Sequence, residues 1–219
     1  MSLFHSSARA KLIANDSGQA MVEFAFIVTM LLIIMSAAID FGRVLNTMQV
    51  IDELSRQGSS LSSRVDTCSA GVSLGEPMET LTCSVQALVA GPLVAGESGQ
   101  SGLSILTYGE IIATAVQNTG TTTSPIYTMT GQYSRGGIVE TSKIGTYSTT
   151  SGAANTATVP AAFSTANGDQ PLQAGQTMYV TEVFYQFHAI TPIGTLTQNW
   201  PLKGSGISLP SLLYDVAYF

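Results

Sequence analysis

The sequence is poor in charge, cysteine and histidine. Only 10% of its 219 residues are charged, against about 25% in a typical domain, and it contains two cysteines, two histidines and one tryptophan. Between residues 91 and 219 only nine residues are Asp, Glu, Lys or Arg, and Ser, Thr, Gly and Gln fill the polar positions. Such a neutral, hydroxyl-rich surface is common outside the cytoplasm.

The shortage of basic residues argues against nucleic acid as a partner. The formal net charge is −6 and the Lys and Arg residues form no run, whereas nucleic-acid-binding proteins cluster them. The sequence also lacks a P-loop, an H-E-x-x-H motif and a C-x-x-C motif, so we expect no metal and no cofactor. His188 is isolated and the serines are too numerous to select a nucleophile with its base. We therefore expect no catalytic residues and no enzymatic activity.

One stretch stands apart from this composition, because residues 17–39 are almost entirely apolar. From Phe24 to Ile39 no charge occurs over 16 residues, which as a helix measure about 24 Å. A bilayer core is about 30 Å thick, and the helix reaches that length only by extending back to Gln19. Glu23 then lies inside the apolar segment, where a carboxylate is costly and indicates a function.

The residues before this helix follow a recognisable order. A short leader with Arg9 and Lys11 ends in Gly18, and Glu23 is the fifth residue after that glycine. This order resembles the processing site of type IV prepilins. The resemblance implies that a prepilin peptidase cuts between Gly18 and Gln19 on the cytoplasmic side. The cut creates an α-amino group on Gln19 with which the carboxylate of Glu23, next to Phe24, is expected to pair.

A longer pattern over residues 17–63 resembles the TadE-like proteins, the minor pilins of tight-adherence (Tad) pilus systems. The family pattern reads roughly G-x-x-x-V-E-F, an apolar run, an acidic-F-G-R element and an A-R-x-G-A element. The matching residues here are Gly18, Glu23 and Phe24, then Asp40, Phe41, Gly42 and Arg43, then Arg56 and Gly58. Ser55 and Ser59 stand where alanines are expected. A weaker similarity lies at residues 179–187.

Two other fates of the N-terminal segment stay open at this point. Ser36-Ala37-Ala38 is a small-x-small sequence, so one alternative is an ordinary signal peptide cut after Ala38, and the other is an uncleaved anchor. Against the signal peptide, the apolar run exceeds the usual length of about 7–15 residues. Arg9 and Lys11 favour a cytoplasmic N-terminus, with the rest of the chain outside.

The helix is expected to continue past the membrane to about Arg64. Apolar residues recur there at intervals of three or four, which indicates one stripe that faces the head domain. The resemblance adds that such helices also pack against neighbouring subunits. We expect a leader at 1–18, a transmembrane half at 19–40, an amphipathic continuation at 41–65 and an extracytoplasmic head at 66–219. The stripe consists of Phe41, Val44, Leu45, Met48, Ile51, Leu54, Leu61 and Val65.

The head begins with the two cysteines. In an oxidising compartment Cys68 and Cys83 are expected to form a disulfide, and two free buried thiols are the alternative. Acidic residues and Pro77 mark the start of a short helix that would run to Ala90. Glu182 would need a partner if buried, and Arg135 or Lys143 would serve.

Alternating residues between turn signals predict several strands beyond this helix. The fold class that follows is α+β, with a long N-terminal helix packed on an antiparallel sheet as in pilins. Residues 148–176, rich in Ser, Thr, Ala, Gly and Asn, are interpreted as a long surface excursion, and 191–210 as another irregular stretch. The expected strands are Leu103–Tyr108, Ile111–Gln117, Ile126–Tyr133, Ile138–Tyr147, Met178–His188 and Leu212–Phe219.

These features together favour a single-pass protein of the inner (cytoplasmic) membrane. The resemblance implies a minor pilin that helps to assemble, initiate or cap a Tad pilus used in surface adherence. Its partners would be other pilin subunits, the pilus assembly platform, the prepilin peptidase and the membrane. The alternative is a membrane-tethered binding or adhesion module that does not polymerise. A major filament subunit is a third reading, although Tad major pilins are usually far shorter.

Overall fold

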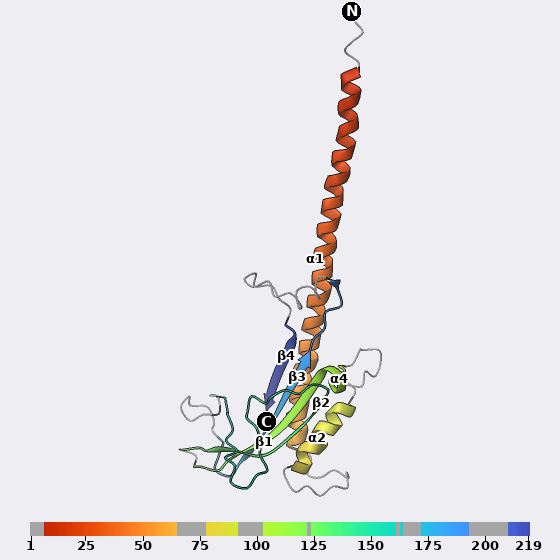
Figure 1. The fold of residues 1–219 in the computed structure, drawn as a ribbon. Coiled ribbons are helices and arrows are strands. Elements are labelled where there is room, and N and C mark those ends of the chain that lie inside the picture. Colours follow the sequence, from red (N-terminus) through yellow and green to blue (C-terminus); the bar gives the residue numbers. More distant parts are fainter. Residues whose placement is uncertain are drawn as a thin grey trace, which may run out of the picture. The chain divides into compact units, whose positions relative to one another are not determined.

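A computed structural model describes residues 7–64, 78–91, 103–121, 124–160, 163, 172–192 and 210–219. The chain divides into two compact units. The first comprises Met1–Val44 with His188–Leu209, and the second comprises Leu45–Phe187 with Pro210–Phe219. Helix α1, Ser7–Ser62, supplies residues to both (Figure 1). The boundaries of leader, transmembrane half and head stay a prediction.

The second unit is built on an antiparallel sheet of four strands in the order β2-β1-β3-β4. Each strand pairs antiparallel with its neighbours (Figure 1). The long N-terminal helix on this sheet confirms the predicted α+β class. The strands are β1, Gly109–Asn118, β2, Tyr127–Gly136, β3, Thr177–Gln186, and β4, Leu212–Tyr218. Two shorter helices are α2, Met78–Ala90, and α4, Ile105–Tyr108.

Two helices cover one face of the sheet. Residues 45–62 of α1 lie against β3 and β4, and α2 lies against β1 and β2. The approach is closest at Gly58, where an added Cβ would come within 2.6 Å of Thr181 and 2.8 Å of Leu88. The helices also meet where the Ser62 hydroxyl donates to Ser84 at 2.8 Å.

An irregular segment, residues 137–148, lies on the opposite face, and we call it the strap. Side chains of the strands form hydrogen bonds with its backbone. Glu110 accepts a hydrogen bond from the N–H of Glu140, and Gln132 bonds both Gly145 and Tyr147. The strap contributes Ile144 to an apolar cluster of six buried residues, whose other members are Val116, Met129, Ala157, Met178 and Val180.

Four of the six predicted strands and the predicted short helix are confirmed within a few residues, and two predicted strands are wrong. The expected strand at 103–108 is instead α4, in which the N–H of Tyr108 bonds the carbonyl of Ser104 at 2.8 Å. The expected strand at 138–147 is instead the irregular strap, in which side chains from the sheet bond the N–H groups of Glu140, Lys143 and Tyr147. The remaining expected strands correspond to β1, β2, β3 and β4, and the expected helix to α2.

The buried stripe of α1 differs in part from the predicted one. Val44, Ile51 and Leu54 are buried as expected, but Phe41, Leu45 and Met48 are exposed. Leu61 is half-buried, and Val65 lies outside the described residues. The buried stripe has the expected spacing but is largely small or polar, since it also includes Asp40, Thr47, Ser55, Gly58, Ser59 and Ser62.

Candidate functional site

The first half of α1 exposes its apolar side chains. An 18-residue window of mean hydropathy 2.4 within residues 18–62 is 0% buried. The hydroxyls of Thr29 and Ser36 donate to the carbonyls four residues earlier, each at 2.8 Å, so they need no outside partner. By length and composition this helix can cross a membrane, and it indicates a single-pass anchor.

The predicted cleavage site lies within α1. Gly18 and Gln19 are helical and exposed, and nothing lies within 4 Å of a Cβ added at Gly18. A glycine in a helix interior costs about 1 kcal/mol relative to alanine, so this is a point at which the helix opens more easily. Cleavage after Gly18 stays a prediction.

Glu23 lies one helical turn beyond Gln19 on the same face, because residues four apart are neighbours on a helix. Its side chain is exposed, as is that of Phe24 at 68%. Within the described part of the chain, no hydrogen bond or ion pair involves Glu23. Glu23 is therefore an exposed polar group on an otherwise apolar helix surface.

In the Asp-Phe-Gly-Arg element at residues 40–43, Asp40 is buried and the other three residues are exposed. Asp40 is fully buried and accepts hydrogen bonds from the N–H of Ile190 at 3.2 Å, from the N–H of Thr191 at 3.4 Å and from the Thr191 hydroxyl. Arg43 donates to the His188 carbonyl at 3.5 Å. Phe41 and Gly42 are exposed, and nothing lies near Gly42. Asp40 and Arg43 thus hold residues 188–191 within the first unit.

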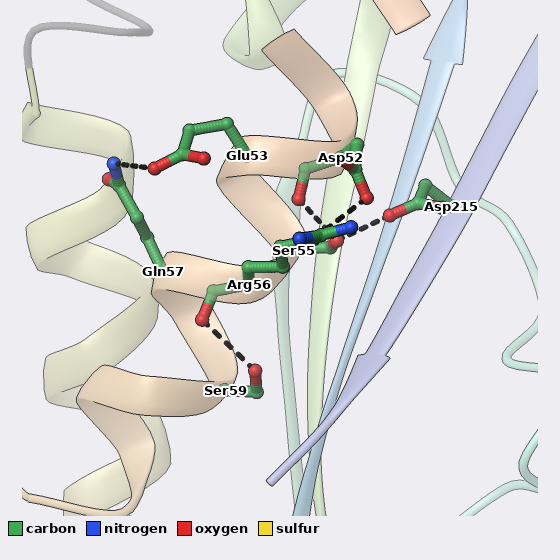
Figure 2. Close-up of polar contacts among 7 residues, drawn as sticks. All are labelled: Asp52, Glu53, Ser55, Arg56, Gln57, Ser59 and Asp215. Carbon is green, nitrogen blue, oxygen red and sulfur yellow. Dashed lines mark hydrogen bonds and ion pairs between the residues drawn. The ribbon is translucent and has the colours of Figure 1, made fainter. Parts of the chain in front are cut away.

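The second element of the family-like pattern, at residues 55–59, lies in the second unit. Ser55 is fully buried and donates to Asp215 of β4 and to the carbonyl of Asp52 (Figure 2). Ser59 is also buried and donates to the carbonyl of Arg56 at 3.1 Å. The serines that replace the expected alanines are therefore small residues at a tight contact, with their hydroxyls satisfied.

Arg56 contributes less than Gly58 to the packing of α1 on the sheet. Its Nε lies 3.0 Å from Asp52, but the two side chains are 69% and 50% exposed, so this pair contributes little to stability (Figure 2). Gly58 is buried at the contact with Thr181 and Leu88.

The disulfide between Cys68 and Cys83 stays a prediction. Cys83 is buried on α2, but Cys68 lies outside the described residues.

Glu182 is the main buried charge on the sheet. It is fully buried, and it accepts hydrogen bonds from the Ser142 hydroxyl, from the Lys143 N–H at 2.9 Å and from the Tyr214 hydroxyl at 3.0 Å. The expected partner Arg135 is exposed on β2. Lys143 contributes its backbone, and its ammonium lies 3.5 Å from the centre of the Tyr214 ring. The sequence did not single out Tyr214, since a tyrosine in a strand is usually a packing residue.

This carboxylate also affects its neighbours. Burial, and then the negative charge of Glu182 and its hydrogen bond, raise the pKa of Tyr214 well above its ordinary value. Burial and the same charge raise the pKa of Tyr218. Three donors surround one carboxylate here, and the result is a fixed attachment of the strap to β3 and β4.

A comparison with protein families finds one match. The family described as TadE-like protein matches residues 18–60. No curated protein and no solved structure matches significantly. The matched residues begin at Gly18 and end just beyond Gly58 and Ser59, so they include Glu23 and the Asp40 element. The chain is therefore similar to the TadE-like proteins over residues 18–60, the length of α1 from the predicted cleavage glycine to its contact with the sheet.

Proposed function

We propose that this protein is a minor pilin, or pseudopilin, of a Tad pilus, with α1 as its membrane anchor and assembly helix. The family match supports a Tad pilus-associated protein, and pilin-related proteins of this kind are in general not enzymes. The observation that carries the proposal is an exposed carboxyl group at Glu23 on an apolar helix. A plain anchor gains nothing from such a group.

In this proposal the carboxylate of Glu23 meets an ammonium during assembly. Cleavage after Gly18 places the new ammonium on Gln19, about 6 Å along the helix axis from Glu23. When helices of neighbouring subunits stack, Glu23 of one subunit pairs with the ammonium of the next. The pair is stronger in a low-dielectric setting than in water. Two charges that are each unfavourable in lipid neutralise each other, and the pairing fixes the axial register between subunits.

In this role the protein spans the inner membrane once. The leader at 1–18 lies in the cytoplasm and is removed by the prepilin peptidase, residues 19–40 cross the inner membrane, and residues 66–219 lie outside. The partners are other pilin subunits and the assembly platform. Residues 41–62 connect the anchor to the head.

The test replaces Glu23 in a strain that carries only the variant. We expect Glu23→Leu to keep membrane insertion and leader removal but to lose piliation and crosslinks to partner pilins. Glu23→Asp should retain part of both. The matched control is Thr29→Leu, because Thr29 is also an exposed polar residue of this helix but its hydroxyl is already bonded. Normal piliation by Glu23→Leu would remove the pairing mechanism and favour a tether that does not polymerise.

A further inference from the structure

The apolar run of α1 ends at Asp40, which is 0% exposed. As a helix, the residues from Gln19 to Ile39 measure about 31 Å, close to the bilayer core of about 30 Å. In a helix that spans the bilayer from Gln19, the residues after Ile39 therefore lie at the level of the lipid headgroups. A carboxylate beside the hydrocarbon is costly unless hydrogen-bond donors surround it.

A distant part of the chain supplies the donors to Asp40. The N–H of Ile190 donates to its carboxylate at 3.2 Å and the N–H of Thr191 at 3.4 Å, and the Thr191 hydroxyl donates as well. Arg43, one turn further along α1, donates to the His188 carbonyl at 3.5 Å. Both parts of the chain belong to the first compact unit. These bonds hold residues 188–191 against α1 at the level where its apolar run ends.

Two large apolar side chains are exposed at this contact. Phe41 follows Asp40 directly and is 56% exposed, and Ile190, whose N–H bonds Asp40, is 69% exposed. Buried and exposed residues alternate from Phe187 to Ile190, so Ile190 lies on the outward side of its segment. The surface carries no exposed carboxylate, because the buried Asp40 is the only acidic residue between residues 24 and 51 and none occurs at 187–192.

We propose that Phe41 and Ile190 form a second membrane contact, with residues 188–191 lying on the bilayer surface beside the point where α1 leaves it. The partner is lipid because this surface continues directly from the apolar helix, whose most hydrophobic window is 0% buried. Removing both exposed side chains from water is favourable. Arg43 is exposed at the same level, where cations interact with anionic headgroups. The inference rests on α1 as a membrane anchor and not on the pilin role, so it holds equally for a tether.

Tryptophan fluorescence measures the depth of single positions in the bilayer. The full chain with Trp200→Phe is placed in vesicles of phosphatidylcholine and phosphatidylglycerol, and Ile190→Trp is the probe. We expect its emission to be quenched by lipids brominated near the glycerol. The matched control is Glu53→Trp, an exposed position about 20 Å further along α1, whose emission should lie at longer wavelength and stay unquenched. Leu32→Trp, within the apolar run, should be quenched by lipids brominated near the chain ends.

The three positions distinguish failure of the inference from failure of the anchor. Quenching in Leu32→Trp without quenching in Ile190→Trp would overturn the second contact and leave the anchor in place. Absence of quenching at both positions would overturn both. Equal quenching of Ile190→Trp and Glu53→Trp would also contradict a specific contact at residue 190.

A photoreactive side chain identifies the partner in the native envelope. Ile190 is exposed, so its replacement by p-benzoylphenylalanine leaves the packed side of the segment unchanged. We expect irradiation to give lipid adducts, detected by the mass of the full chain. Crosslinks to protein instead, whether to a second copy or to a different chain, would overturn the choice of lipid.

Discussion

At the scale of single residues, Gly58 and Gly42 show how one helix can hold two glycines for different reasons. Both lie in α1 and both belong to the family-like pattern. An added Cβ at Gly58 meets Thr181 and Leu88 at under 3.0 Å, whereas nothing lies within 4 Å at Gly42. Thr181 is β-branched on an inner strand, so it cannot move aside easily. Close packing requires glycine at one site only.

This difference gives a matched pair of substitutions. We expect Gly58→Ala to lower the free energy of unfolding by about 1–3 kcal/mol, because the added methyl overpacks the contact. Gly42→Ala should be neutral or raise it by about 0.5–1 kcal/mol, because alanine is the better helix former. Chemical unfolding of the detergent-solubilised full chain measures both. Equal effects of the two changes would show that Gly58 has no special packing role.

Tyr214 supplies a prediction about alkaline pH. Its pKa is raised in the folded chain by burial and then by Glu182, so the folded state holds the phenol proton more tightly than the unfolded state. The stability that this group contributes is present below the unfolded pKa of about 10 and is lost as the pH rises above it. We expect the free energy of unfolding to fall between about pH 9 and 11, and to fall less steeply in Tyr214→Phe. Unchanged slopes would contradict this.

The same variant has a second expected effect at neutral pH. Tyr214→Phe removes one of the three donors to a fully buried carboxylate. The expected cost is about 1–3 kcal/mol, since a buried charged acceptor loses a partner. Comparing unfolding at pH 7 and at pH 11 in one series separates the two effects.

At the scale of elements, the strap explains why polar side chains line the face of the sheet opposite the helices. A segment without regular structure still has backbone groups to satisfy. Here Glu110, Gln132 and Glu182 satisfy them from three different strands. The alternation of residues 138–147 resembles a strand, but side chains from across the sheet bond several of its backbone groups, and the Gly109 carbonyl and the Thr158 N–H bond others.

The predicted disulfide lies close to the contact between α1 and α2. Cys83 is buried on α2, near Ser84, which bonds Ser62 at the end of α1. We expect Cys68 and Cys83 to be linked, which closes a loop of about 15 residues and contributes about 3 kcal/mol in the chain-entropy model. Non-reducing peptide mapping of protein from the native envelope should show one linked pair. Two alkylatable thiols in that material would refute the link.

At the scale of the whole molecule, the main prediction concerns the mature N-terminus. We expect protein from its native host, or protein made together with its peptidase, to begin at Gln19, because Gly18 precedes an apolar helix with Glu23 at the fifth position. Intact mass measurement decides this. Gly18→Leu should keep the leader attached. A start at Ile39 would indicate an ordinary signal peptidase, and a retained leader would favour the tether.

The sequence alone predicted the exposed N-terminal part of α1 and its family-like segment. A charge-free run, a single carboxylate within it and the spacing from Gly18 are local patterns, and they predicted an exposed apolar helix and the family-like segment. The helix α2 and the strands β1, β2, β3 and β4 were also predictable, because alternation and turn residues are local signals too.

Only the tertiary structure decided which faces and partners these elements use. The buried stripe of α1 is rich in Ser, Thr and Gly, so hydrophobic periodicity selected Phe41, Leu45 and Met48, which are exposed. The donors to Glu182 come from positions 142, 143 and 214, and no local pattern joins residues so far apart. The position of β4 at one end of the described sheet likewise follows only from the strand order, because a strand's neighbours are set by long-range pairing and not by its own residues.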